Sequence, residues 1–408
     1  MNIIYLHQYF NTPAMAGGTR SYEMAKRLVA SGHEVHMITS FRETCDTKTW
    51  FHTVEEGIHV HWYPILYNNK LSYNDRVKAF VKFVYVAAKK AASISADIVF
   101  ATSTPLTIAL PAVYTAHRHK IPMVFEVRDL WPELPIAIGA LKNPFIKYAA
   151  RRVERFAYKN AKRIIALSPG MAAGVEKSGY PAHHISIIPN SCDLDLFQPD
   201  PKKAARFRQE HIELENRPII LYPGTLGKIN GVGWLVHLAA RFQALGSDCC
   251  FVVIGAGMEW DDVKKLASEQ CVLDKNFFMY QQVPKQKLVE AFCAASMIVS
   301  LFIDLPEMEA NSANKFFDAL ASGTAIAVNY GGWQAELIQS YDTGVILSRD
   351  INNAAEILTD FLGNKEKILR CGDNGRSLAA AHYSRDDLAK NLEDVLSDAV
   401  QQNDISDS

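Results

Sequence analysis

The sequence predicts an α/β protein with two doubly wound parallel-sheet domains in tandem. Three observations support this fold class. A buried strand, a glycine loop, an amphipathic helix and a second strand follow one another by Thr39. The same order restarts after residue 200. In both halves, further apolar strands alternate with helical stretches. Alternating strands and helices build parallel sheets, so each half is expected to be a Rossmann-like domain.

In the first half, the opening strand is Ile3–Leu6, and a loop with Pro13, Gly17 and Gly18 follows it. The spacing of apolar residues predicts a helix over Tyr22–Ala30. The later strands expected in this half are 35–39, 98–101, 123–127 and 164–166.

In the second half, Ile219–Tyr222 is the expected first strand. A glycine-rich loop over Gly224–Gly233 and a helix over Trp234–Ala244 come next, as in the first half. The strands expected after them are 250–254, 277–280, 297–301 and 325–329.

Proline, asparagine and aspartate accumulate around Ile188-Pro189-Asn190, which places the domain boundary there. We therefore expect a first domain over 1–190 and a second over 191–380. The last segment, 381–408, is expected to form a helix that packs back toward the first domain and ends in a frayed polar tail.

The composition excludes several classes of protein. The chain has 408 residues, 49% of them hydrophobic and 21% charged, which excludes a disordered chain, a coiled coil and a disulfide-bonded miniprotein. The seven cysteines show no CxxC spacing, which indicates reduced thiols and a cytosolic protein. The N-terminus lacks the pattern of a signal peptide. The uncharged stretch 98–116 contains prolines and hydroxyl residues, so we interpret it as a strand, a turn and a helix rather than a membrane span.

The charges are unevenly distributed. Residues 1–190 hold 23 Lys and Arg against 13 Asp and Glu, a net charge of +10, and the remainder holds 20 against 31, a net charge of −11. Two basic amphipathic stretches, 76–90 and 146–163, lie in the basic half. In the first, an apolar face of Val77, Phe80, Val81 and Val84 opposes Lys78, Lys82 and Lys89; in the second, Ile146, Ala150, Val153 and Ala157 oppose Arg151, Arg155, Lys159 and Lys162. Both patterns are typical of core-packed helices with a solvated face, or of helices that dock on anionic lipid.

Two glycine loops could hold an anionic ligand. Gly17 and Gly18, followed by Arg20, lie between the first strand and helix, at the edge where doubly wound sheets bind ligands. A plain turn is the alternative. In the second domain, Gly224, Thr225 and Lys228 belong to a loop that could cradle phosphate, although it is not a P-loop. Gly255-Ala256-Gly257 lacks the third glycine of a dinucleotide fingerprint, which argues against NAD binding.

The segment from Asn311 to Gly323 predicts a helix with Ser312 as N-cap and Gly323 as C-cap. The amides of its first turn, together with Lys315, could hold a pyrophosphate. Asp318 lies about one turn further on, where it could accept hydrogen bonds from ribose hydroxyls. A capped core helix is the alternative.

Polar residues also crowd the end of the strand at Glu126, where Arg128, Asp129 and Glu133 follow. A structural ion pair of Arg128 with Asp129 or Glu126 is the alternative to a site. Asp193-Leu194-Asp195 matches a metal-binding DxD pattern but is interpreted as a turn, and the basic run 117–120 as an exposed helix end.

Taken together, these segments resemble the bacterial family 4 glycosyltransferases, which have the GT-B fold: two Rossmann-like domains that face each other across a cleft. The segments that carry the resemblance, over nearly the whole chain, are GGTRSYEMAKRLVASGHEVHMIT, IIPNSCDLDLFQP, LYPGTLGKINGVGWL, FVVIGAG, NSANKFFDALASG and GGWQAEL. EVRDLWPE and NSANKFFDALASG are most similar to the O-antigen and capsule branch, which includes N-acetyl-fucosaminyl transferases.

The resemblance implies a UDP-sugar donor held by the second domain, an acceptor held by the first, retention of anomeric configuration, and no obligatory metal or other cofactor. It implies that the donor is bound by Gly17, Gly18, Arg20, Gly224, Thr225, Lys228, Val283, Asn311, Ser312, Ala313, Asn314, Lys315 and Asp318. Among these, Asp318 would bind the ribose and Val283 would lie near the uracil. Lys228 and Lys315 would stabilise the leaving diphosphate, and Asp129 or Arg128 would position the acceptor.

Three positions depart from the family pattern. Ala310 stands where the family has its first glutamate, with Glu309 one residue away. Thr225 and Asn230 replace the usual arginine and lysine of the donor loop, and Arg128 replaces a histidine.

The expected function is transfer of an N-acetylated sugar to a lipid-linked or saccharide acceptor in surface polysaccharide synthesis. The expected location is the cytoplasm, on the inner face of the membrane, with no nucleic acid partner. The alternatives are a UDP-GlcNAc epimerase and a non-catalytic protein that binds sugar nucleotides.

Overall fold

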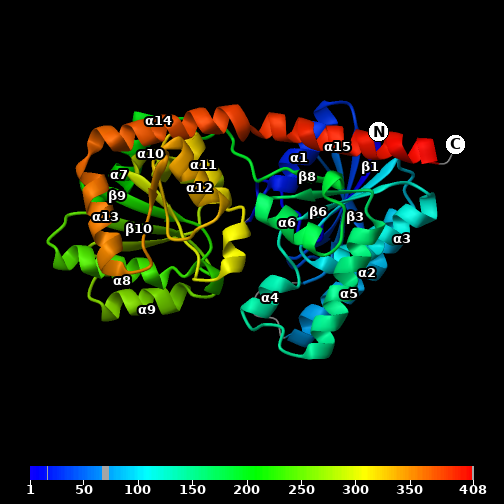
Figure 1. Ribbon diagram of the computed structural model, residues 1–408, viewed down its shortest axis with the longest axis horizontal. Coiled ribbons are helices and arrows are strands. Elements are labelled where there is room, and N and C mark those ends of the chain that lie inside the picture. Colours follow the sequence, from blue (N-terminus) through cyan, green and yellow to red (C-terminus); the bar gives the residue numbers. More distant parts are fainter. Residues whose placement is uncertain (16, 67–72, 407–408) are drawn as a thin grey trace. The chain divides into compact units, whose positions relative to one another are not determined.

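The computed structural model describes residues 1–15, 17–66 and 73–406, and the contacts within it divide the chain into two compact units (Figure 1). Unit 1 contains Met1–Pro189 together with the residues from Asp386 on. Unit 2 contains Asn190–Arg385.

In the described residues, unit 1 has an eight-stranded sheet in the order β3-β4-β2-β1-β5-β6-β7-β8. Only β3 runs antiparallel to its neighbour, β4. The strands are β1 Asn2–Leu6, β2 Glu34–Phe41, β3 Phe51–Glu55, β4 Ile58–Pro64, β5 Ile98–Thr102, β6 Met123–Val127, β7 Arg163–Ala166 and β8 Ile185–Ile187. The helices are α1 Arg20–Ala30, α2 Tyr73–Ala91, α3 Ala109–His119, α4 Glu133–Ala137, α5 Pro144–Asn160 and α6 Pro169–Lys177.

The sheet of unit 2 is parallel throughout its described strands, in the order β11-β10-β9-β12-β13-β14. The strands are β9 Ile219–Pro223, β10 Cys250–Gly255, β11 Phe277–Gln281, β12 Met297–Ser300, β13 Ile326–Val328 and β14 Gly344–Ile346. The helices are α7 Pro201–Glu210, α8 Gly233–Ala244, α9 Trp260–Glu269, α10 Lys285–Ala294, α11 Asn314–Ser322, α12 Trp333–Tyr341, α13 Ile351–Gly363 and α14 Lys365–His382.

Helices cover both faces of each sheet, as Figure 1 shows. In unit 1, α2, α3 and α5 enclose one core, and α1 packs on the opposite face. The last helix, α15 (Arg385–Ser406), adds Leu388, Leu392 and Leu396 to the core on the α1 side. The chain therefore crosses from unit 2 back to unit 1 at its end.

The strands expected from the sequence all form, each within a few residues of its expected bounds. The uncharged stretch 98–116 is a strand, a turn and a helix, as expected. No helix in the described ranges is both long enough and apolar enough to cross a membrane. Asp193 Oδ1 accepts a hydrogen bond from the Leu196 amide at 3.0 Å, which confirms the turn expected there.

Candidate functional site

Lys315 is the central side chain of the site in unit 2. It lies in the first turn of α11, and its ammonium group packs 4.7 Å from the ring centroid of Tyr222 and 5.9 Å from that of Phe302. It donates a long hydrogen bond of 3.4 Å to the Tyr222 hydroxyl. Burial lowers the pKa of Lys315 to about 8. No carboxylate of the described residues forms an ion pair with it, so its positive charge is available to an anionic ligand.

The glycine loop after β9 lies close to this lysine. A Cβ on Gly224 would lie 2.9 Å from Lys315 Cε, so a larger residue at this position would require the lysine side chain to shift. The Tyr222 hydroxyl donates a hydrogen bond of 2.8 Å to the Thr225 carbonyl oxygen, which fixes the loop over the ring. Thr225 and Lys228 are exposed on the same loop.

The start of α11 differs from the expectation at Ser312. Ala313, not Ser312, is the N-cap, and no side chain caps the helix. The Ser312 hydroxyl instead accepts a hydrogen bond from the Asn190 amide at 3.2 Å, and Asn190 Nδ2 donates to the Ser312 carbonyl oxygen at 2.5 Å. Ser312 therefore anchors the domain linker. Because the first amides of a helix have no intrahelical acceptor and Ser312 does not cap them, they remain suited to an anion next to Lys315.

Asp318 lies on the same helix face as Lys315, three residues later. Its carboxylate accepts a hydrogen bond of 3.0 Å from Lys285, the first residue of α10. Val283, expected near the base, is half-buried just before this helix. The sequence analysis missed Lys285, although a lysine that opens a helix directly after Val283 was a usable signal.

The remaining expected donor residues lie around the start of α11. Asn311 is half-buried, Ala313 is buried and Asn314 is exposed. Glu309 lies against Gly331, where a Cβ would come within 3.1 Å of Glu309 Oε1. Glu309 also lines a pocket of about 210 Å³ at the ends of β13 and β14, with Asp304, Tyr330 and Arg349 among its other walls.

In unit 1, Arg20 is buried, and its guanidinium is engaged within the protein, which differs from the expectation that it binds the donor. Its guanidinium donates to Glu126 Oε1 at 3.0 and 2.9 Å and to the carbonyl oxygens of Ile188 and Pro189. Burial raises the pKa of Glu126, but the charges of Arg20 and Arg128 and a hydrogen bond from Thr102 outweigh it, and the net shift is downward. Arg20 and Glu126 therefore connect α1 and β6 to the segment after β8.

Arg128 and Asp129 follow β6 without pairing with each other. Thr104 donates a hydrogen bond of 2.9 Å to Asp129, and burial raises the pKa of Asp129. Arg128 Nη1 lies 3.4 Å from Nε2 of His7, a residue that the sequence analysis missed. In the described residues, Arg128 forms no ion pair with Asp129 or Glu126, so the structural alternative is wrong.

The glycines of the first loop are exposed. Gly17 adopts a φ of +130°, and a Cβ there would lie 2.5 Å from Asn11 Nδ2. Asn11 donates a hydrogen bond of 3.3 Å to the Gly18 carbonyl oxygen, so this side chain holds the loop. The backbone of Gly17 and Gly18 is therefore open to a ligand.

The face of α2 that packs on the core differs from the expected one. Ala79, Phe83 and Ala87 are buried, whereas Val81 is 64% exposed. The side chain of Val77 lies outside the described residues. Lys78, Lys82 and Lys89 are exposed, as expected.

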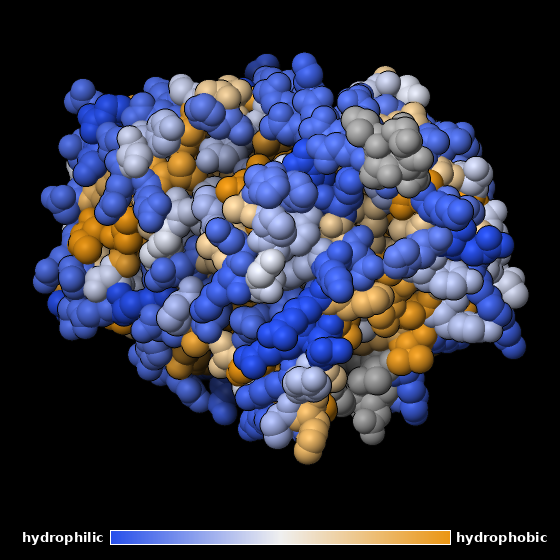
Figure 2. All heavy atoms as spheres, turned by 45° about the vertical axis from the view of Figure 1, so that its right-hand side comes forward, coloured by the Kyte–Doolittle hydropathy of each residue, from blue (hydrophilic) through white to orange (hydrophobic). Residues whose placement is uncertain are grey.

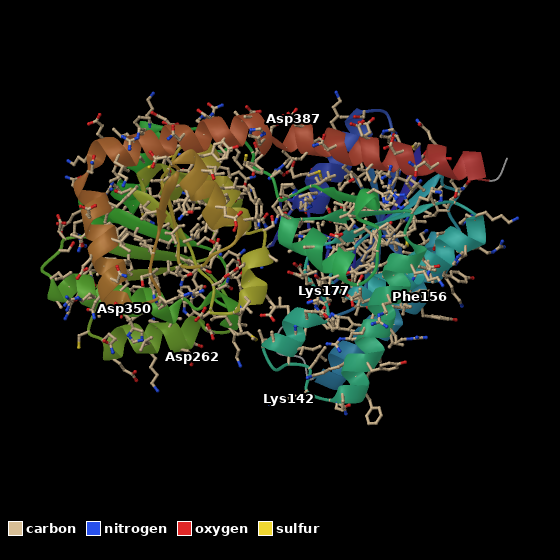
Figure 3. All side chains as sticks on the ribbon, viewed as in Figure 1. Lys142, Phe156, Lys177, Asp262, Asp350 and Asp387 are labelled. Atoms are coloured by element: carbon tan, nitrogen blue, oxygen red, sulfur yellow. The ribbon has the colours of Figure 1, made fainter. Side chains whose placement is uncertain are left out.

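The outer face of α5 combines apolar and basic side chains. Phe145 is 82% and Tyr148 65% exposed, and Arg151, Arg155 and Lys159 are exposed nearby. Figure 3 labels Phe156 on α5 and Lys142 in the loop before it. Figure 2 shows orange apolar residues among blue polar ones on the side of unit 1 that is turned forward.

Two family models match the chain. Residues 16–191 match the glycosyl transferase 4-like domain, and residues 203–378 match the glycosyl transferases group 1. The chain belongs to the glycosyltransferase family. The expected membership of the glycosyltransferases is therefore confirmed, with one model matching each half of the chain.

Curated relatives of this glycosyltransferase are distant. A GDP-mannose-dependent α-(1-6)-phosphatidylinositol monomannoside mannosyltransferase of Mycobacterium tuberculosis is 24% identical over 53% of this chain and 56% of its own. A putative colanic acid biosynthesis glycosyl transferase, WcaI of Escherichia coli, is 22% identical over 66% of this chain and 70% of its own. The matches thus cover only part of the length of these two relatives, 56% of the first and 70% of the second.

Solved structures of glycosyltransferases share the fold of this one. HepE of Anabaena, in complex with UDP and glucose, has a TM-score of 0.73 and 14% identity, and the match covers 98% of this chain and 100% of that one. WaaG, which is involved in lipopolysaccharide biosynthesis, has a TM-score of 0.69 and 17% identity, with 97% and 99% covered. The expected GT-B class of two parallel-sheet α/β domains is confirmed.

Proposed function

We propose that this glycosyltransferase transfers a sugar from a UDP-sugar, with retention of configuration, to a lipid-linked or saccharide acceptor of bacterial surface polysaccharide. The observation that supports this most strongly is Lys315 at the start of α11, an ammonium group with no ion-pair partner among the described residues. Breaking a glycosyl–phosphate bond requires stabilisation of the charge that develops on the leaving diphosphate. Lys315, the first amides of α11 and the exposed Lys228 supply it without a metal ion.

The choice of UDP rests on relatives. HepE binds UDP and glucose, whereas the mycobacterial mannosyltransferase is GDP-mannose-dependent. The resemblance of EVRDLWPE together with NSANKFFDALASG to the O-antigen and capsule branch favours an N-acetylated sugar such as N-acetyl-fucosamine. WcaI and WaaG, whose names refer to colanic acid and lipopolysaccharide, support a role in polysaccharide synthesis.

The first unit is proposed to bind the acceptor. Asp129, held by Thr104, and the guanidinium of Arg128 lie at the carboxyl end of the sheet, where they can orient an acceptor hydroxyl. The epimerase alternative needs a free acid and base. Of its candidate carboxylates, Glu126 is occupied by Arg20, which disfavours this alternative.

A panel of UDP- and GDP-sugars incubated with a bacterial lipid extract, and read by mass spectrometry of the product, tests the proposal. We expect a mass increase of one sugar on the acceptor, unchanged by EDTA. An isomerised nucleotide sugar without acceptor would support the epimerase instead. Activity that EDTA abolishes would contradict the metal-free mechanism, and tight binding without transfer to any acceptor would indicate a binding protein.

We further propose that α2 and α5 attach the protein to the anionic inner face of the cytoplasmic membrane. Exposed aromatic side chains, Phe145 and Tyr148, lie among basic ones on α5, and three exposed lysines lie on α2. Aromatic groups suit the membrane interface, and each basic residue near an anionic surface contributes about 1 kcal/mol.

Co-sedimentation with vesicles of phosphatidylglycerol tests this attachment. Charge reversal of Lys78, Lys82 and Lys89 to glutamate should weaken partitioning roughly a hundredfold or more, because about 1 kcal/mol is lost per residue. The matched control reverses Lys264 and Lys265, two exposed lysines of α9 in unit 2. Equal co-sedimentation of both variants would refute the attachment.

A further inference from the structure

Four histidines lie together on one face of the unit 1 sheet, where β2, β4 and β3 form its edge. His36 lies on β2, His59 and His61 on β4, and His52 on β3; the strand register places His36 opposite His59 and His52 opposite His61. The centroids of neighbouring rings are 5.0–5.5 Å apart. His36 is the third residue of β2, so the cluster lies away from the carboxyl ends of the strands, where sheets of this kind bind substrates.

The ring nitrogens of this cluster meet in two pairs. His36 Nδ1 lies 3.3 Å from His61 Nε2, and His59 Nδ1 lies 3.4 Å from His52 Nε2. Two imidazole nitrogens that bind one tetrahedral Zn²⁺, each at about 2.0–2.1 Å from the ion, lie about 3.3–3.4 Å from each other. Each pair therefore already has the nitrogen separation that two ligands of one metal ion require.

A carboxylate orients one of the two pairs. His36 Nε2 lies 3.0 Å from Glu34 Oε1. Because an ionised carboxylate only accepts hydrogen bonds, Nε2 carries the proton, and Nδ1 of the neutral ring presents its lone pair to His61. Histidines that bind metal ions usually have this arrangement, in which one ring nitrogen donates to a carboxylate and the other binds the ion. The pair of His36 and His61 is therefore the better candidate for a metal site.

The number and kind of ligands limit which ion can bind. In the described ranges, no group of three or more histidine, cysteine, aspartate or glutamate side chains is placed to hold a metal ion, so the pair supplies two ligands and water completes the coordination. Glu34 faces the pair with a negative charge, and Lys90 acts on His61 with a positive one. Because these charges oppose each other, the imidazoles decide the selectivity. They favour Zn²⁺ and Cu²⁺ over Mg²⁺ and Ca²⁺, which prefer oxygen ligands.

We propose that His36 Nδ1 and His61 Nε2 bind one divalent transition-metal ion, Zn²⁺ or Cu²⁺, and that Glu34 is the positioning residue of this site. On binding, the ring proton of His61 moves to Nδ1, so both rings stay neutral and no proton is released. The ion links β2 to β4 and stabilises unit 1, because it binds only the folded strands. It takes no part in sugar transfer, and the proposal is independent of the proposed function.

Titration calorimetry with Zn²⁺ tests the site, on the full chain without an affinity tag, at pH 7.5 and after treatment with a chelator. The variants are His36→Gln, His61→Gln and Glu34→Gln. The matched control is His184→Gln, because His183 and His184 also lie ring against ring in unit 1, with centroids 4.2 Å apart in an edge-on contact.

We expect Zn²⁺ to bind His36→Gln and His61→Gln roughly tenfold or more weakly than the wild type, and Glu34→Gln about tenfold more weakly, as is typical of a lost partner of a metal-bound histidine. His184→Gln should equal the wild type. Zn²⁺ should raise the melting temperature of unit 1 in the wild type more than in His36→Gln. With one equivalent of Cu²⁺, electron paramagnetic resonance should show two coupled imidazole nitrogens in the wild type and one in His36→Gln.

Three results would overturn the proposal. They are a wild type that binds no Zn²⁺, an equal affinity of the wild type and both histidine variants, and a loss in His184→Gln as large as that in His36→Gln, which indicates unspecific binding to surface histidines. If a histidine variant does not fold, Glu34→Gln decides, because Glu34 is exposed. An unchanged Zn²⁺ affinity of Glu34→Gln would then contradict the site.

Discussion

Lys315 illustrates how a single residue combines a stability cost with a function. Its ammonium group is packed between aromatic rings and has lost part of its hydration, which lowers its pKa to about 8. A charged group placed this way is destabilising until a ligand neutralises it. Removal of this charge should therefore raise the stability of the protein and lower its activity.

Lys315→Ala should lower turnover roughly a hundredfold or more, because one donor that stabilises a leaving group typically contributes about 3–4 kcal/mol. Lys315→Met should lose activity similarly but melt at an equal or higher temperature than the wild type, because it fills the space without burying a charge. Lys315→Arg serves as the control that keeps the charge. Near-normal turnover of Lys315→Ala would exclude the phosphate role.

The lowered pKa also predicts a pH dependence of nucleotide binding. Below pH 8 the Lys315 side chain is protonated and attracts the diphosphate; above pH 8 it becomes neutral in the free protein. The affinity for UDP should therefore fall as the pH rises from 7 to 9.5, with a break near pH 8. Titration calorimetry at a series of pH values measures this affinity. Lys315→Met should bind weakly at every pH, without the break; a flat profile for the wild type would contradict the account.

At the scale of elements, the βαβ repeats could be predicted because buried strands and glycine loops are local patterns. The strands β3 and β4 were missed: β3 alternates half-buried and exposed residues, and the antiparallel hairpin interrupts the parallel order. The short strands β8 and β14, each at an edge of its sheet, were missed as well. The α11 segment was predicted as a helix with Gly323 at its C-terminus, and Gly323 has the left-handed conformation expected there. The predicted N-cap was wrong because Ser312 forms hydrogen bonds with Asn190, which lies 122 residues away in the sequence.

The prediction of which residues of α2 pack on the core was wrong for a related reason. Val81 and Ala79 are both apolar, so hydrophobicity alone does not distinguish them. Ala79, Phe83 and Ala87 are buried because they are the residues that pack against the rest of unit 1. The pair of Lys285 and Asp318 was likewise beyond sequence reasoning, because it joins residues 33 positions apart on two helices. Contacts between residues that are far apart in the sequence could not be predicted from local sequence patterns.

The edge formed by β2, β4 and β3 carries four stacked histidines: His36, His52, His59 and His61. Burial lowers the pKa of His61 to about 3, with Lys90 and the other histidines adding to the shift; burial also lowers the pKa of His36 against the opposing effect of Glu34. Because the unfolded state protonates these groups near pH 6.5, stability is full above pH 6.5 and falls as the pH is lowered.

The histidine cluster should therefore lower the melting temperature of unit 1 at pH 5 relative to pH 7.5, whereas Glu154, whose pKa burial raises to about 7, contributes in the opposite direction. A loss of about 1 kcal/mol, after allowance for solvent screening, corresponds to about 2–4 °C. Differential scanning calorimetry of the wild type and of His61→Gln measures the difference between the two pH values. The variant should show a smaller difference, and an equal one would refute the role of this cluster.

At the scale of the whole molecule, α15 completes the core of unit 1 with residues from the far end of the chain. Leu392 and Leu396 are almost fully buried among residues of β1, β2 and α1. The stability of unit 1 consequently depends on the last segment, while unit 2 has its own core. The two units are expected to respond separately to changes in this helix.

Leu392→Ala and Leu396→Ala should each destabilise unit 1 by about 2–5 kcal/mol, the range for such truncations in a core. Calorimetry should show the transition of unit 1 moving to lower temperature while that of unit 2 stays. Lys390→Ala, an exposed position on the same helix, is the control. Equal shifts of both transitions would contradict a separate core for each unit.

The central claim concerns the contact between the donor diphosphate and unit 2. A crystal structure of the protein with UDP tests it most directly. We predict a phosphate oxygen within hydrogen-bond distance of Lys315 Nζ and of the first amides of α11, with the ribose next to Asp318 and Lys285. A well-ordered UDP bound elsewhere, with Lys315 still unpaired, would contradict the account.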